Sequence, residues 1–267
     1  MNARMLIATL GMFLALIALS APTASAEEAL SAKEIMRLVD RMNSTDDSQR
    51  DLTMTLINKK GKTRERSVVS FQKKIDDDND KAMVRFTKPG DVAGVGLLTI
   101  EHSDRDDDQW LYMPAQKKTR RISAASKSDS FMGTDFTYDD MSSIKLDEYD
   151  YTIKGKETID GVETIVIESV PNNDKRREES GYSKSIVWVD PVRYVMLKSD
   201  FYNLKGEHIK TLVLSGYKQY DKIWMPDRME MTTLKREHRT VLEFSNTSIN
   251  KGLDDDLFTE RTLLRGR

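Results

Sequence analysis

The side chains that most often carry out chemistry are scarce in this chain of 267 residues. It contains no cysteine, which excludes disulfides, thiolate metal sites and a cysteine nucleophile. The three histidines, His102, His208 and His238, are scattered, and neither a Gly-x-Ser-x-Gly nor a His-Glu-x-x-His motif is present. A carboxylate pair of the kind that glycosidases use could occur in any β-protein, but the residues favour a protein that is not an enzyme and needs no cofactor.

Two acidic runs, residues 76–80 and 104–108, contain closely spaced aspartates that resemble the start of a calcium-binding loop. In the EF-hand template counted from Asp104, Gln109 stands where glycine is required and Ala115 where glutamate is required. The run at residues 76–80 does not fit the template either. We therefore predict no metal site and interpret both runs as charged hairpin tips.

The charge balance bears on the partners of the chain. Lysine and arginine together number 42 against 44 aspartates and glutamates, a net charge of −2, so no basic excess is available to neutralise nucleic-acid phosphates. The most basic segment is an expected strand with Lys118, Arg120 and Arg121. It is either a solvated edge strand protected against aggregation or a rim that holds lipid headgroup phosphates or an acidic partner.

Residues 1–26 have the pattern of a secretory signal. A basic residue, Arg4, precedes an apolar run of about 15 residues, and the segment ends in Ala24-Ser25-Ala26. The run is shorter than the roughly 20 residues of a membrane span, and the small residues suit a signal peptidase. We predict cleavage after Ala26, export to the periplasm, and one domain over residues 27–267 that is a monomer.

The elements that must position any site are mostly strands. One helix is expected after the signal, because Ser31 and Glu34 have capping-box spacing and apolar residues repeat helically from Ile35 to Met42. After Gln49 the hydrophobic pattern alternates with a period of two almost to the end. Expected strands include residues 96–102, 109–114, 117–123, 149–155, 162–170, 184–190, 194–202, 208–220, 223–234 and 239–247. The pattern predicts a mainly β protein with one large antiparallel sheet of about eleven strands.

Such a sheet must curl to hide its apolar face from water, so its inward side chains can line a cavity as well as a core. Charges on both faces of some strands, such as Arg64 and Glu65, argue against a transmembrane barrel. The loop at residues 124–148 carries aromatic side chains that could close a cavity or dock a partner. The candidate lipid-binding residues are Leu52, Met54, Leu56, Phe71, Val84, Phe86, Leu98, Trp110, Tyr112, Phe131, Phe136, Leu197, Phe201, Met229, Met231, Leu242 and Phe244. For Trp110 and Tyr112 the alternative is a strand covered on both faces.

Two long blocks, residues 106–123 and 130–140, resemble the signature of the outer-membrane lipoprotein-sorting proteins. This is the broad group similar to the lipoprotein localization carrier LolA. The first block contains Asp-Gln-Trp-Leu-Tyr-Met-Pro followed by Lys-Lys-Thr-Arg-Arg, and the second contains Gly-Thr-Asp-Phe. The likeness extends through residues 94–100, 180–184, 188–190 and 257–259.

This resemblance implies an unclosed β-barrel whose mouth is plugged by loops or helices, with a hydrophobic cavity that shields acyl chains across the periplasm. It also implies a gating arginine, for which Arg64, Arg66 and Arg85 are candidates. Transfer of a sixteen-carbon chain into water costs about 12 kcal/mol at about 0.8 kcal/mol per methylene, so a carrier needs a deep apolar surface. The expected partners are lipid or lipoprotein acyl chains, an inner-membrane exporter and an outer-membrane acceptor. An accessory module of a resistance-nodulation-division-type exporter, which carries nothing, is the alternative.

Overall fold

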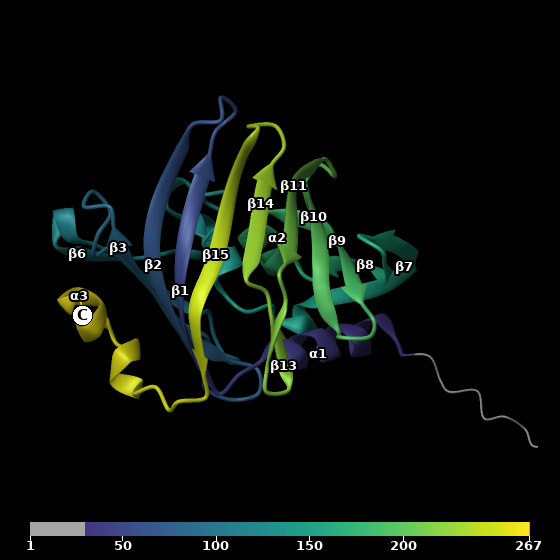
Figure 1. Cartoon of the computed structure of the whole chain (residues 1–267), viewed down its shortest axis with the longest axis horizontal. Helices are drawn as coiled ribbons and strands as arrows, with labels where there is room; N and C mark the ends of the chain where they lie inside the picture. Colours follow the sequence, from purple (N-terminus) through teal and green to yellow (C-terminus); the bar gives the residue numbers. More distant parts are fainter. Residues whose placement is uncertain (1–29, 267) are drawn as a thin grey trace, which may run out of the picture.

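The computed structural model describes residues 30–266, so the predicted signal at residues 1–26 lies outside the described residues. Thirteen strands form one antiparallel sheet in the order β6-β5-β4-β3-β2-β1-β15-β14-β11-β10-β9-β8-β7 (Figure 1). The strands are β1 Asp47–Ile57, β2 Thr63–Lys74, β3 Asp80–Lys88, β4 Gly96–Ile100, β5 Asp108–Met113, β6 Lys118–Arg121, β7 Tyr149–Ile159, β8 Val162–Pro171, β9 Tyr182–Asp190, β10 Val195–Asn203, β11 His208–Ser215, β14 Arg228–Thr233 and β15 His238–Ile249. The sheet is curved and does not close, because β6 and β7 at its two ends do not pair with each other.

The main sheet has thirteen strands rather than about eleven, and two of the predicted long strands, residues 208–220 and 223–234, are each interrupted. Gly216 adopts a positive φ of 66° after β11, and the Asp227 amide donates a hydrogen bond of 3.2 Å to its carbonyl. Between these residues the chain leaves the main sheet and forms a separate hairpin of β12 Lys218–Tyr220 and β13 Ile223–Met225. Glycine suits such a point because it reaches positive φ without steric cost.

The predicted helix is confirmed as α1 Ala32–Asn43 with a complete capping box. The Ser31 amide donates to the Glu34 carboxylate at 2.8 Å, and the Glu34 amide donates to the Ser31 hydroxyl at 3.3 Å. The buried face of α1 packs against Ile167 of β8 and against Val187 and Val189 of β9. No helix among residues 30–266 combines the length and apolar character that crossing a membrane requires.

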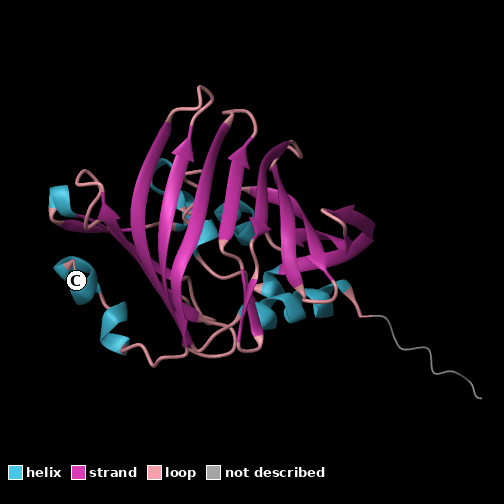
Figure 2. Ribbon diagram, in the orientation of Figure 1, coloured by secondary structure: helices cyan, strands magenta, loops and turns pink. Residues whose placement is uncertain are grey.

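Different segments cover the two faces of the sheet (Figure 2). We call residues 122–148 the plug; they join β6 to β7 and contain the short helices η2 Ala124–Ser126, η3 Phe131–Gly133, η4 Asp139–Met141 and η5 Leu146–Glu148. We call residues 253–265 the C-terminal cover, which contains η6 Asp255–Phe258 and α3 Glu260–Arg265. The plug packs on the inner face, whereas the cover packs on the outer face of β3, β4 and β5.

Candidate functional site

The inner face of the sheet carries the largest apolar cluster among the described residues, which we call the inner cluster. Leu52, Met54 and Leu56 contribute from β1, because alternate residues of a strand point to the same face. Phe86, Met231 and Leu242 belong to the same cluster from neighbouring strands and are almost fully buried. The predicted members that lie in the cluster are Leu52, Met54, Leu56, Val84, Phe86, Phe131, Phe136, Phe201, Met229, Met231, Leu242 and Phe244.

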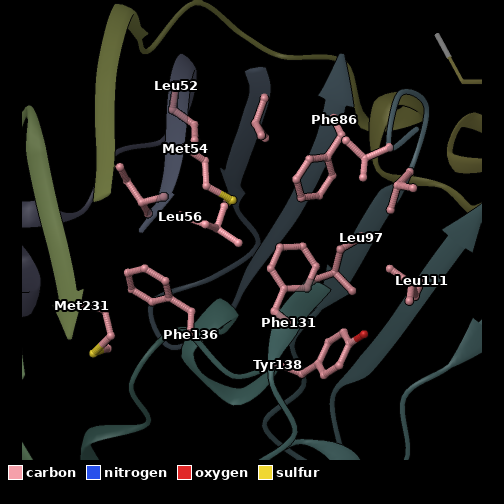
Figure 3. Close-up of a cluster of buried hydrophobic side chains, with 14 of the residues drawn as sticks. Leu52, Met54, Leu56, Phe86, Leu97, Leu111, Phe131, Phe136, Tyr138 and Met231 are labelled. Carbon is pink, nitrogen blue, oxygen red and sulfur yellow. The ribbon is translucent and has the colours of Figure 1, made fainter. Parts of the chain in front are cut away.

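The plug fills the space in front of these strands with aromatic side chains (Figure 3). Phe131, Phe136 and Tyr138 are all buried in the inner cluster. The Phe131 ring lies 5.8 Å from the Phe86 ring and 5.6 Å from the Tyr138 ring, the latter edge to face. The sequence predicts an open hollow at this place, but the plug rings occupy it and shield this apolar face from water.

A buried carboxylate fastens the plug to the far strands of the sheet. The side chain of Asp135 is completely buried and accepts hydrogen bonds from Thr233 at 2.6 Å, His238 at 2.7 Å and Thr240 at 2.7 Å. The Asp135 amide also donates to the Thr240 hydroxyl at 3.0 Å. Because β14 and β15 supply these partners, the Gly-Thr-Asp-Phe segment is tied to strands about a hundred residues away in sequence.

A second set of polar contacts fastens the plug through its backbone. Arg66 of β2 donates to the Met132 carbonyl at 2.8 Å, and burial lowers the pKa of its guanidinium. Gln109 of β5 is fully buried and donates to the Tyr138 carbonyl at 2.9 Å. Of the three candidate gating arginines, Arg66 therefore contacts the plug, whereas Arg85 donates to the Thr262 carbonyl in the C-terminal cover.

Four predicted lipid-binding residues lie on the other face of the sheet. Phe71, Leu98, Trp110 and Tyr112 pack under the C-terminal cover, so they do not belong to the inner cluster. In β4 and β5 both faces are apolar, and Leu97 and Leu111 take the inner positions instead. This arrangement confirms the alternative for Trp110 and Tyr112, a strand covered on both faces.

Leu197 is buried but lies outside the inner cluster, where Met196 packs instead. The pairing of β10 with β9 shifts by one residue between Met196 and Lys198. Such a bulge changes the face on which the following side chains lie. The simple alternation that predicted Leu197 as a cavity residue fails at this irregularity.

The acidic run at residues 104–108 is not a simple exposed hairpin tip. Asp107 and Asp108 are buried, and Asp108 forms ion pairs with Arg105, at 2.6 Å, and with Arg121. Lys118 and Arg120 are exposed on β6. No group of three or more His, Cys, Asp or Glu side chains among the described residues has a geometry that could hold a metal ion.

A polar hollow of about 220 Å³, which we call the seam pocket, lies between parts of the chain that belong to the two ends of the open sheet. The β4–β5 connection, the plug and α2 Asp174–Ser180 line it. Buried Lys127 of the plug pairs with Glu179 of α2 at 3.0 Å, and Lys145 pairs with Asp107 at 2.7 Å. The charges of this cluster come from segments that are distant in sequence and look solvated, so the sequence gives no sign that they meet.

Comparisons with known proteins give relatives of the same fold. A family model described as an uncharacterized protein family matches residues 78–265. A domain from Vibrio parahaemolyticus, described as an outer-membrane lipoprotein-sorting protein, is 34% identical over 88% of this chain and 98% of its own, with a TM-score of 0.82. A DUF1329 family protein from Desulfovibrio piger is 30% identical over 87% of this chain and 97% of its own, with a TM-score of 0.82.

A LolA superfamily protein from Nitrosomonas europaea shares the fold with a TM-score of 0.69, at 20% identity over 88% of this chain and all of its own. No curated protein sequence is significantly similar to the chain.

Proposed function

Because the chain belongs to the family of outer-membrane lipoprotein-sorting proteins, we propose that it carries acyl chains of lipoproteins or lipids and delivers them towards the outer membrane. The acyl chains bind the inner cluster, and the protein acts in the periplasm as a monomer without catalysis. One observation carries the proposal: a continuous apolar face of the sheet is covered by a separate segment that polar contacts hold in place.

Cargo binds by replacing the plug rings on the inner face. Withdrawing one aromatic ring from the cluster costs about 1.5–3 kcal/mol, whereas sheltering a sixteen-carbon chain gains about 12 kcal/mol. The polar anchors at Arg66 and Asp135 exchange their partners for water at a net cost of about 1 kcal/mol each. A single acyl chain therefore outweighs the contacts of Phe131, Phe136 and Tyr138, and the plug returns when the cargo leaves.

The path of the chain links plug movement to the opening of the sheet. The plug runs directly from β6 to β7, the two strands at the ends of the sheet that do not pair with each other. Any increase in the separation of these strands pulls on both ends of the plug. Cargo entry and widening of the open side are therefore parts of one motion.

A disulfide lock tests this function, since the native chain has no cysteine to interfere. The Asp135 amide lies 3.0 Å from the Thr240 hydroxyl, so Asp135→Cys with Thr240→Cys places two thiols at the plug anchor. We expect the oxidised variant to take up a fluorescent fatty acid far more slowly than the reduced variant. Equal uptake by the two forms would show that the plug does not need to move.

Solvent extraction of the purified protein followed by lipid mass spectrometry separates the carrier from the exporter module. Lipid at near-stoichiometric amount supports the carrier. A clean extract, together with tight binding to an inner-membrane exporter, favours the accessory module. Phe244→Glu places a charge in the inner cluster and is expected to abolish fatty-acid uptake, whereas Phe71→Glu on the outer face provides the matched control.

A further inference from the structure

The seam pocket has walls of balanced charge. Five cationic and five anionic side chains line it together with His102. Lys175 forms an ion pair with Asp106, and Arg176 pairs with Asp139, with Glu148 at 3.6 Å and with Glu179 at 3.8 Å. Because the opposite charges of the lining balance, a ligand with a single charge finds no net countercharge there. The pocket therefore suits a compact group that carries both charges.

Two buried polar atoms on α2 lack partners among the described residues. The Oε1 atom of Glu179 accepts no hydrogen bond, although this residue is only 5% exposed. The Nε atom of Arg176 donates none, although this residue is only 7% exposed. An unsatisfied buried polar group destabilises the fold, so a ligand that satisfies both groups gains affinity. Such a ligand must present an N–H donor and an oxygen acceptor together.

A second hollow of about 270 Å³ adjoins the seam pocket. Both hollows are lined by Asp106, Asp107 and Lys127. The second hollow also contacts Ile122, which is 4% exposed and belongs to the inner cluster. A molecule with its polar end in the seam pocket therefore lies beside Ile122, a member of the inner cluster.

We propose that the seam pocket binds the phosphoethanolamine headgroup of a phospholipid whose acyl chains enter the inner cluster; this inference rests on the proposed function. The primary ammonium donates to Glu179 Oε1, and the phosphate accepts from Arg176 Nε with Lys175 beside it. At about 30 Å³ per water molecule, the pocket holds the equivalent of about seven waters, enough for a headgroup of this size. A choline headgroup has no N–H to donate, and a glycerol headgroup has no cation, so both bind less well.

Calorimetry with soluble dihexanoyl lipids that share acyl chains tests the headgroup alone. We expect the full mature chain to bind dihexanoyl phosphatidylethanolamine about tenfold more tightly than the matching phosphatidylcholine or phosphatidylglycerol. Glu179→Gln is expected to remove this preference, whereas Glu178→Gln, an exposed neighbour on α2, keeps it. Equal affinity for the three lipids in the native chain overturns the proposal.

Two further measurements keep the outcome decisive. If Glu179→Gln does not fold, Lys175→Gln at the rim is expected to weaken phosphatidylethanolamine binding several-fold, and an unchanged affinity counts against the assignment. Glycerophosphoethanolamine that binds as tightly as the lipid would identify a soluble zwitterion as the ligand and overturn the lipid headgroup. Fatty-acid uptake without headgroup preference defeats only this inference. Headgroup binding without fatty-acid uptake defeats the carrier function and, with it, the entry of the acyl chains into the inner cluster.

Discussion

The plug and the C-terminal cover pack on opposite faces of β3, β4 and β5, and they hold to the sheet in different ways. The cover packs Leu263 so closely that a methyl group on Gly96 would lie 2.7 Å from its Cδ1 atom. The plug also packs its aromatic rings in the inner cluster, but its polar contacts are spread across the sheet, from Arg66 on β2 to the partners of Asp135 on β14 and β15. The polar contacts of the cover come from Lys73, Lys81 and Arg85 on β2 and β3. A polar group that leaves its protein partner can form a hydrogen bond with water instead. An apolar side chain that leaves close packing gains no comparable contact in water.

The connections of the two segments differ as well. The plug is joined at both ends to the edge strands β6 and β7, and the cover is joined only to the end of β15 among the described residues. A widening of the open side therefore acts on the plug and leaves the cover in place. Under the proposed function, the inner apolar face is uncovered when cargo binds, whereas the outer face stays part of the core.

The largest effect is expected from Phe131→Ala in the plug. Phe131 is 1% exposed, and loss of a buried phenyl ring lowers the free energy of unfolding by about 3–5 kcal/mol. Because the same ring competes with cargo, fatty-acid uptake is expected to become faster as stability falls. Urea unfolding and stopped-flow uptake check the two effects, with Ile144→Ala, an exposed position of the plug, as control. Slower uptake would place Phe131 in the permanent core.

Leu263→Ala in the cover tests the opposite side of the comparison. Leu263 is completely buried, so its truncation is expected to lower the free energy of unfolding by about 2–5 kcal/mol. Fatty-acid uptake by the folded protein is expected to stay unchanged, because the inner cluster is not touched. The neighbouring Leu264→Ala, at an exposed position, provides the control for stability. A changed uptake rate would mean that the two faces communicate.

A smaller effect is expected from Asp135→Asn at the plug anchor. The substitution keeps one acceptor but removes the charge that faces His238, which lowers the free energy of unfolding by about 2 kcal/mol. Uptake is expected to become several-fold faster, since the anchor restrains the plug. Asp129→Asn changes an exposed carboxylate of the same segment and serves as control. Unchanged uptake in Asp135→Asn would assign the restraint to the contacts of Arg66 and Gln109.

The sequence predicts the general architecture well because its signals are local. The capping box at Ser31 and Glu34 defines α1, and the alternation along β1 and β15 assigns Leu52, Met54 and Leu242 to the inner face. Each of these predictions depends on neighbours within a few residues. Alternation along one strand is enough wherever one face is apolar and the other polar.

The sequence cannot predict on which face of the sheet a side chain lies where both faces of a strand are apolar or where the pairing register of two strands shifts. Leu97 and Leu98 are adjacent and equally apolar, yet one lies under the plug and the other under the cover. The sequence also does not predict the hydrogen bonds of Asp135, because its partners lie about a hundred residues away along the chain. Glu179 lies in a charged stretch that looks exposed, and only the folded chain brings it to Lys127.

The smallest effect concerns the ion pairs at the start of the cover. Lys73 and Lys81, which contact Asp255 at 2.6 Å and 2.8 Å, hold the pKa of this carboxyl down to about 2. The folded state thus releases this proton more readily than the unfolded chain does, so the stabilisation is full above about pH 4 and is lost as the pH falls towards 2. Asp255→Asn is expected to lower the Tm slightly at pH 6 and not at pH 2. For Asp256→Asn, at an exposed neighbouring position, the difference in Tm from the native protein is expected to be the same at pH 6 and at pH 2. If Asp255→Asn lowers the Tm at pH 2 as much as at pH 6, this end of the cover is held by packing alone, as Leu263 is.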